Sequence, residues 1–293
     1  MIYTVNHVTN VKYDEPVRHA RFNLRLQPVN WPGQSVSDFA LTFDGAPATL
    51  TTRSAAYPAL VTRVVIDGPI KSLIVKSSFR VTIDDAMLDM VPGELSIGQV
   101  ALQARDLQDL GATAPAHFLY GSPLSPVSSE IGQWAGDLLS PEATALENGL
   151  ALARRIREQF VYDPKATEAD TPVETAFAMR RGVCQDFTHI LIAALRWAGM
   201  PAAYASGYLR TRPPPGQPRL VGVDAMHAWA MLWCGPQRGW VGIDPTNGCL
   251  TGSDHIFVAM GRDYADVAPI DGIFIGAGTQ RLTTAVDVVP INV

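Results

Sequence analysis

The hydrophobic period changes along this chain, and that change most constrains its fold. Within the first 85 residues, apolar and polar side chains alternate, as in Arg21-Phe22-Asn23-Leu24-Arg25-Leu26-Gln27. A period of two places alternate side chains on one face of a half-buried strand. Several such runs joined by short turns predict an antiparallel β-sandwich over residues 1–85. No cluster of Cys, His and acidic residues occurs there, so we interpret it as a scaffold or recognition domain.

The second part of the chain has helix signals first and strand signals afterwards. The sequence predicts an irregular connecting segment over residues 86–139 and a separate core over residues 140–293. Helix starts are expected at Ser140-Pro141 and at the capping box Thr171-Pro172-Val173-Glu174. A third helix, with a broad apolar face and a stop at Gly199, is expected to be buried. Strands are expected at 203–209, 226–233, 240–244, 256–260 and 282–289, which together predict an α+β core with a mostly antiparallel sheet.

Composition excludes several classes of protein. The 23 Lys and Arg against 28 Asp and Glu give a net charge of −5, and no basic run suggests nucleic acid or an anionic membrane as a partner. Three cysteines are too few for a disulfide framework, and their spacing predicts no zinc site or other metal site. Met1 to Asn10 lacks the pattern of a secretory signal, and no stretch approaches the roughly 18 apolar residues of a membrane span. We therefore expect a cytoplasmic chain with free thiols and no cofactor.

Cys184 is the residue that needs an explanation. It lies at or just before the start of the buried helix, where the free N–H groups and the helix dipole favour a thiolate. Arg180 and Arg181 could add positive charge, whereas Asp186 would oppose a thiolate. The alternative is that Cys184 is a small buried hydrophobic residue, as most free cysteines are.

A β-hairpin supplies possible partners for this thiol. If the strands 226–233 and 240–244 pair so that Cys234 faces Gln237, His227 lies directly opposite Asp244 on the same face. Asp244 could then accept a hydrogen bond from one ring nitrogen of His227 and leave the other nitrogen for the thiol. A slip of one residue would separate them. Taken singly, His227 could be structural and Asp244 a strand-end cap, and Asn247 is a second candidate for orienting the ring.

Cys184, His227 and Asp244 are thus candidates for a nucleophile, a general base and an orienting carboxylate. The backbone N–H of Cys184 is a candidate donor to the oxyanion of an acyl-transfer intermediate. His189 lies five residues after Cys184, off its helical face, and is expected to be structural. Cys234 and Cys249 are expected to be incidental. The three tryptophans of the hairpin are expected to pack in the core: Trp229, Trp233 and Trp240.

These motifs carry a family resemblance. Gly182-Val183-Cys184-Gln185-Asp186-Phe187, His227-Ala228-Trp229-Ala230 and Gly239-Trp240-Val241-Gly242-Ile243-Asp244-Pro245 resemble the Cys, His and Asp motifs of bacterial transglutaminase-like proteins. Gly261-Arg262-Asp263-Tyr264 resembles a further segment of that family, and the opening of the chain is similar to its β-rich N-terminal domain. The resemblance implies a papain-like core and acyl chemistry on amides. Met231 stands where many relatives carry an acidic residue, and no EF-hand pattern suggests calcium.

The leading hypothesis is a thiol-dependent enzyme of the transglutaminase-like cysteine protease or amidase type. It would act on a protein, peptide or other amide substrate, by hydrolysis or by transamidation. The alternative is a catalytically silent binding or assembly module with the same fold. A transferase that uses an acyl carrier ranks below both, because no phosphate cradle for coenzyme A is recognisable. The sequence leaves the oligomeric state open.

Overall fold

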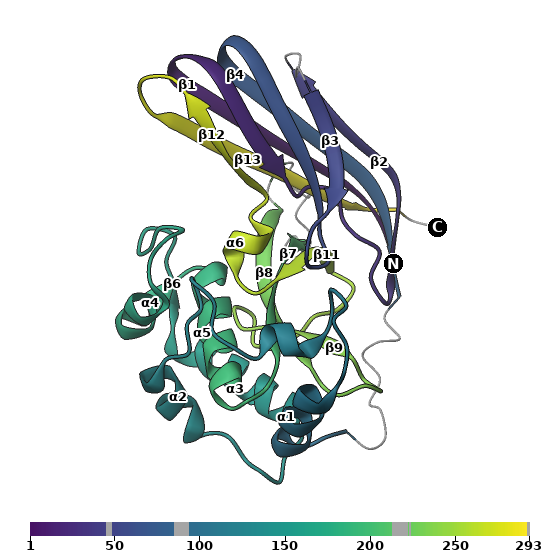
Figure 1. The fold of residues 1–293 in the computed structure, drawn as a ribbon, viewed down its shortest axis with the longest axis vertical. Coiled ribbons are helices and arrows are strands. Elements are labelled where there is room, and N and C mark those ends of the chain that lie inside the picture. The colour runs from purple at the N-terminus through teal and green to yellow at the C-terminus, as the bar shows by residue number, and fades with distance from the viewer. Residues whose placement is uncertain (45–48, 85–93, 213–221, 223, 292–293) are drawn as a thin grey trace.

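The protein consists of a long antiparallel sheet and a helical core built on a second sheet (Figure 1). The computed structural model describes residues 1–44, 49–84, 94–212, 222 and 224–291. In Figure 1 the long sheet lies above the core, and the N-terminus lies beside the junction of the two parts. The predicted α+β fold class is confirmed, and the two large sheets are antiparallel.

Two long strands organise the first sheet. β1 (Ile2–Leu24) and β4 (Leu60–Ile83) pair antiparallel over almost their whole length, with a register shift between Lys12 and His19. β2 (Gln34–Asp44) and β3 (Thr49–Ser54) pair with opposite halves of β4. Buried side chains from both halves of the sheet form one apolar cluster, so the halves pack face to face as two layers that share β1 and β4. That cluster includes Val11, Leu73 and Val75 from one half and Val17, Phe22 and Val64 from the other.

The C-terminal strands complete this first sheet. β12 (Ile270–Ile275) pairs with the second half of β1, and β13 (Gln280–Pro290) pairs with its first half. The three-part division of the chain stays a prediction, but strand pairing crosses it, because these two strands lie in residues 140–293. Alternation within a strand shows which face is buried and does not show which distant strand is its neighbour.

The predicted irregular segment contains regular structure. Within its described part, from residue 94 onward, α1 (Ile97–Asp106) begins with a capping box from Ser96 and Gln99. A 3₁₀ turn, η2 (Pro115–Phe118), and α2 (Ser129–Gly136) follow. Val100 and Ile131 from these helices are fully buried in the main core, so this segment is part of the core and not a linker.

The central helix packs on a five-stranded sheet. α5 (Cys184–Trp197) lies against β7 (Ala202–Leu209) and β8 (Ala225–Trp233), and it is buried on nearly all sides. Gly199 adopts the left-handed backbone conformation that ends α5, as the sequence predicts. The sheet has the order β10-β9-β8-β7-β11, with β9 (Trp240–Asp244), β10 (Cys249–Leu250) and β11 (His255–Gly261). The remaining core elements are α3 (Ala145–Gln159), α4 (Val173–Met179), α6 (Tyr264–Val267) and the pair β5 (Val161–Tyr162) and β6 (Arg181–Gly182).

One predicted helix start and one predicted cap are wrong. α3 is capped by Thr144, whose hydroxyl and backbone N–H form a capping box with Glu147, and Ser140 precedes the helix by several residues. The hydroxyl of Thr171 accepts from the N–H of Glu168, so it closes an upstream turn. α4 therefore begins after Pro172 without a side-chain cap.

Candidate active site

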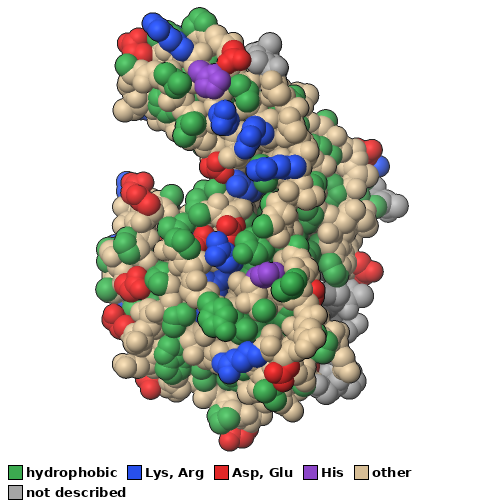
Figure 2. Space-filling view, viewed as in Figure 1, with side chains coloured by type: hydrophobic (Ala, Val, Ile, Leu, Met, Phe, Trp, Pro, Cys, Tyr) green, Lys and Arg blue, Asp and Glu red, His purple; other side chains and the backbone are tan. Residues whose placement is uncertain are grey.

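Cys184 is the first residue of α5 and is partly exposed in a cavity of about 310 Å³. The N–H groups of the first helical turn have no partner within the helix and point toward its N-terminus. The cavity lies where the core meets the first sheet, and on the face shown in Figure 2 the molecule is hollowed between these two parts. A solvent-accessible thiol at a helix N-terminus is therefore available to a ligand.

Asp186 fixes the backbone that presents Cys184. Its side chain is buried, and one carboxylate oxygen accepts from the N–H of Val183 at 2.8 Å and from the hydroxyl of Thr167 at 2.7 Å. Burial raises the pKa of Asp186, and these two hydrogen bonds oppose the rise. Gly182 permits the arrangement, because a Cβ there would lie 2.4 Å from the same oxygen.

The two arginines before Cys184 point elsewhere. The guanidinium of Arg180 lies 4.0 Å from the ring centroid of Phe177 and 4.7 Å from that of Phe160. Arg181 forms an ion pair with Asp163 at 3.2 Å. The positive charge that the sequence allowed beside the thiol is thus engaged in packing and in a surface contact.

The hairpin brings His227 and Asp244 together in a register that differs from the predicted one. Trp233 faces Trp240 and Ala230 faces Ile243, a shift of two residues. The connecting turn runs from Gly235 to Gly239, and both glycines have positive φ. A shift of two keeps the same face of each strand, so Nε2 of His227 still meets Oδ2 of Asp244 at 2.8 Å.

Asp244 is a buried carboxylate with many donors. Its Oδ1 accepts from the backbone N–H groups of Thr246 and Asn247, and its Oδ2 also accepts from the side-chain amide of Asn247 at 2.7 Å. Burial alone would raise the pKa of Asp244, but the hydrogen bonds from His227 and His255 outweigh it and hold the pKa well below its usual range. Asn247, the alternative orienting residue, donates to the carboxylate of Asp244, and it is Asp244 that bonds to the His227 ring.

His227 is positioned between the carboxylate and the thiol. Nε2 is engaged by Asp244, and the ring lines the same cavity as Cys184. Burial lowers the pKa of His227, but hydrogen bonds to Asp244 and to Cys184 outweigh it and raise the pKa to about 10. An imidazolium at this position would stabilise negative charge on the sulfur.

His255 is a site residue to which the sequence analysis assigned no role. Its Nε2 donates to Oδ2 of Asp244 at 3.0 Å, and its Nδ1 accepts from the N–H of Gly252 at 3.2 Å. This pair of contacts requires the neutral ring with the proton on Nε2. A second histidine that opens a strand, as His227 nearly does, is a signal that was available in the sequence.

The same three side chains are the candidate metal ligands within the described residues. Nε2 of His227, Nε2 of His255 and a carboxylate oxygen of Asp244 lie within 4.8 Å of one another. Both rings direct Nε2 to one oxygen, which also accepts from Asn247, so hydrogen bonds account for the cluster. This arrangement is that of an oriented carboxylate and not of an open coordination site.

Other residues singled out by the sequence have structural contacts. His189 is buried, and its Nε2 accepts from the backbone N–H of Tyr264. Trp229, Trp233 and Trp240 are all buried, as expected for core residues. Burial raises the pKa of Cys234 to about 12 and also raises that of Cys249, so neither thiol is activated.

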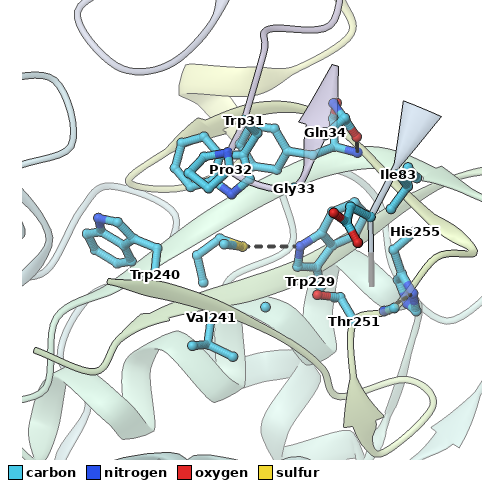
Figure 3. Close-up of a pocket in the computed structure, with 15 residues that line it drawn as sticks. Trp31, Pro32, Gly33, Gln34, Ile83, Trp229, Trp240, Val241, Thr251 and His255 are labelled. Atoms are coloured by element: carbon cyan, nitrogen blue, oxygen red, sulfur yellow. Dashed lines mark hydrogen bonds between the residues drawn. The ribbon is translucent and has the colours of Figure 1, made fainter. Parts of the chain in front are cut away.

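Met231 lies in a second, smaller pocket. Figure 3 shows the indole N–H of Trp229 directed at its sulfur, and the N to S distance is 3.3 Å. Trp31 and Trp240 line this pocket as well, and His255 lies at one end of it. The departure from the family pattern at Met231 therefore changes this pocket and not the lining of the Cys184 cavity.

The fold and the site together define a class: α+β proteins with a papain-like core, in which a cysteine at a helix start and a His–Asp pair on a hairpin share one cavity. Residues 132–245 match the model of the transglutaminase-like superfamily, and residues 3–82 match that of the bacterial transglutaminase-like N-terminal region. The chain belongs to the transglutaminase-like superfamily.

Relatives match over almost the full length. The "Uncharacterized protein Rv2569c" of Mycobacterium tuberculosis is 33% identical over 99% of this chain and 93% of its own length. The "Uncharacterized protein ML0607" of Mycobacterium leprae is 30% identical over 97% of each chain. A crystal structure named as a "Putative Cysteine Protease" from Cytophaga hutchinsonii superposes with a TM-score of 0.74 at 19% identity, covering 100% of this chain and 92% of that chain. This likeness establishes the shared fold.

Among the described helices, none combines the length and the apolar character that a membrane span requires.

Proposed function

We propose that this protein is a thiol-dependent acyl-transfer enzyme that acts on amide bonds through Cys184, His227 and Asp244. The observation that carries the proposal is that His227 bonds to a buried, ionised Asp244 while sharing a cavity with a helix-terminal thiol. We propose a protein, peptide or other amide as the substrate. We also propose a cytoplasmic location, which agrees with the three free cysteines.

The chemistry follows from the roles of the three side chains. The Cys184 thiolate attacks the carbonyl carbon, and the oxyanion accepts hydrogen bonds from N–H groups at the start of α5. The His227 imidazolium donates its proton to the departing amine, which leaves a thioester on Cys184. Neutral His227 then takes a proton from water or from a second amine as it attacks the thioester. Water yields an acid, an amine yields a new amide, and each path restores the thiolate–imidazolium pair.

The test measures thioester formation and turnover on the full chain. Purified protein is incubated with a panel of fluorogenic amides and with an alkyne-bearing chloroacetamide, and intact-mass spectra report any acyl adduct. We expect labelling at Cys184 and turnover that Cys184→Ala abolishes, while Cys249→Ala leaves both unchanged. Equal labelling of Cys184→Ala and the unchanged protein would refute the proposal. Labelling of Cys184 without turnover across the panel would favour a silent binding module instead.

Asp244 offers a second arm of this test. Asp244→Asn places an amide donor where two rings donate, so the tautomer and orientation of His227 change. We expect kcat to fall by roughly 10³–10⁴-fold, with the fold retained by circular dichroism. A fall below tenfold would show that Asp244 does not act through His227.

A further inference from the structure

The cavity around Cys184 has one wall that comes from the first sheet. His7 and Thr9 of β1, and Leu282 and Thr284 of β13, line it opposite the core residues. Thr9 pairs with Thr284 in the ladder, and positions two apart on a strand share a face. These four side chains therefore form one continuous surface, which we call the β1–β13 wall.

The wall carries no charge at neutral pH. Burial lowers the pKa of His7 to about 4, and its ring is held by the hydroxyl of Tyr208 at 2.9 Å and by that of Thr9 at 2.7 Å. Thr284 presents a hydroxyl group and Leu282 presents an apolar side chain, whereas the hydroxyl of the buried Thr9 is already engaged by His7.

The rest of the described lining is also free of Asp, Glu, Lys and Arg. Its polar side chains besides His227 and Cys184 are hydroxyl and amide groups. The start of β12 contributes Ile270, and the core contributes Val183, Gln185, Tyr204, Ser206, Met226, Ala228, Tyr264 and Pro269. Away from the Cys184–His227 pair, a charged group enclosed here would lose water without gaining an ionic partner, which is unfavourable. An uncharged group could instead bond to hydroxyls and pack on apolar atoms.

Resting on the proposed function, we propose that the β1–β13 wall binds the acyl group of the substrate and selects an uncharged one. Leu282 and Thr284 are its specificity-determining residues, because both are exposed and face the cavity. The cavity, at about 310 Å³, is at the small end of the roughly 300–1,000 Å³ typical of ligand sites, so it suits a single side chain or a short acyl chain.

Charged substitutions at neighbouring positions of β13 provide the test. Thr284 faces the cavity, whereas Thr283 is also exposed but lies on the opposite face of the strand. Thr284→Lys and Thr284→Glu are compared with Thr283→Lys and Thr283→Glu, which make the same change in net charge. The substrates are p-nitrophenyl esters of equal chain length: hexanoate, adipate monoester and 6-aminohexanoate.

We expect the unchanged protein to prefer the hexanoate ester by about tenfold or more in kcat/KM over both charged esters. Thr284→Lys should raise the adipate to hexanoate ratio roughly tenfold, and Thr284→Glu should do so for 6-aminohexanoate. The Thr283 variants should stay within about twofold of the unchanged protein, because their charges are solvated and screened. Equal shifts in the ester ratios at positions 283 and 284 would refute the proposal that the β1–β13 wall selects the acyl group. Equal use of the three esters by the unchanged protein would refute it as well.

A second readout separates this inference from the proposed function. Chloroacetamides with the same neutral, anionic and cationic tails alkylate Cys184 without any turnover, and their rates are compared across the same variants. If no ester is hydrolysed above the Cys184→Ala background, the proposed function fails. The alkylation rates then still test the wall: faster alkylation by the neutral tail supports selection of an uncharged group, and equal rates for the three tails refute it.

Discussion

At the scale of single residues, the site depends on side chains that hold other side chains. Asp244 is fully buried. It stays ionised because the rings of His227 and His255 and the side-chain amide of Asn247 donate to the same oxygen. Asp186 holds the backbone before Cys184, and Gly182 leaves room for it. The sequence suggested Cys184, His227 and Asp244 as candidates from residue type and spacing. The sequence analysis missed His255, because the role of this residue depends on a contact with Asp244 that no local pattern encodes.

The role of His255 can be tested with His255→Phe, which fills the space and removes the donor. A lost hydrogen bond to a charged group should lower kcat/KM by roughly tenfold or more. Because Asp244 would then interact more strongly with His227, the proton resonance of the His227 Nε2–H should move downfield. His255→Gln, which can donate, should recover part of the rate. His19→Phe in the sandwich should change neither quantity, and a structural role alone would leave the resonance in place.

Gly182→Ala tests the packing that positions Cys184. The added Cβ would meet the Asp186 carboxylate, so the cap on α5 must move. Overpacking of this kind should reduce the free energy of unfolding by about 1–3 kcal/mol and slow the alkylation of Cys184. Gly98→Ala is the matched control, because nothing lies within 4 Å of its Cβ position and it lies in α1. Urea unfolding showing equal effects at both positions would contradict this explanation.

At the scale of helices and strands, the sequence predicted the type of those core elements that it located better than their exact starts. The strand 240–244 is confirmed to the residue, and the central helix begins at Cys184 as expected. The start of α3 was misplaced because Ser140-Pro141 and Thr144 with Glu147 are competing signals only four residues apart. The structure selects Thr144, whose hydroxyl and partner carboxylate satisfy two free N–H groups.

The cap of α3 gives a prediction at this scale. Thr144→Ala should lower the free energy of unfolding by about 1 kcal/mol, because it removes the side chain that caps the helix. Ser140→Ala should change it by less than about 0.5 kcal/mol, since the hydroxyl contacts only the exposed Glu142. Chemical denaturation of both variants measures the difference. A larger loss of stability in Ser140→Ala than in Thr144→Ala would instead support Ser140 as the cap of α3.

At the scale of the whole molecule, the first sheet and the core form one working unit. β12 and β13 leave the core, return to pair with β1, and bring Leu282 and Thr284 to the Cys184 cavity. The N-terminal part, which the sequence suggested as a scaffold or recognition domain, thus supplies part of the cavity lining. The His7 ring of β1 bonds to the hydroxyl of Tyr208 in β7, so buried polar groups also join the two parts.

The dependence of stability on pH follows from two of these groups. Burial lowers the pKa of His7 and of His189 to about 4, below the unfolded value of 6.5. The unfolded chain therefore binds more protons between these values, and stability falls as the pH drops from about 6.5 toward 4. Together, protonation of the two rings should lower the free energy of unfolding by roughly 3–4 kcal/mol between pH 7 and pH 5.

His227 does not contribute to the loss of stability between about pH 6.5 and pH 4. Its raised pKa gives a contribution that is fully present below 6.5 and is lost only as the pH rises toward about 10. Urea unfolding at pH 7 and pH 5 measures the acid loss, and His7→Asn should reduce it by about half. An unfolding free energy that is the same at both pH values would contradict the burial of these rings as neutral groups.

The sequence by itself determined the alternation of the strands, the apolar face and N-terminal cysteine of α5, and the residue types of the thiol, imidazole and carboxylate. These are local properties, set by side-chain period, backbone preference and chemistry. Tertiary structure decided the rest: the partner of β13, the hairpin register, the direction of Arg180, the contact of His255 with Asp244 and the wall of the cavity. Each of these depends on which distant groups become neighbours when the chain is packed, and a local pattern carries no record of that choice.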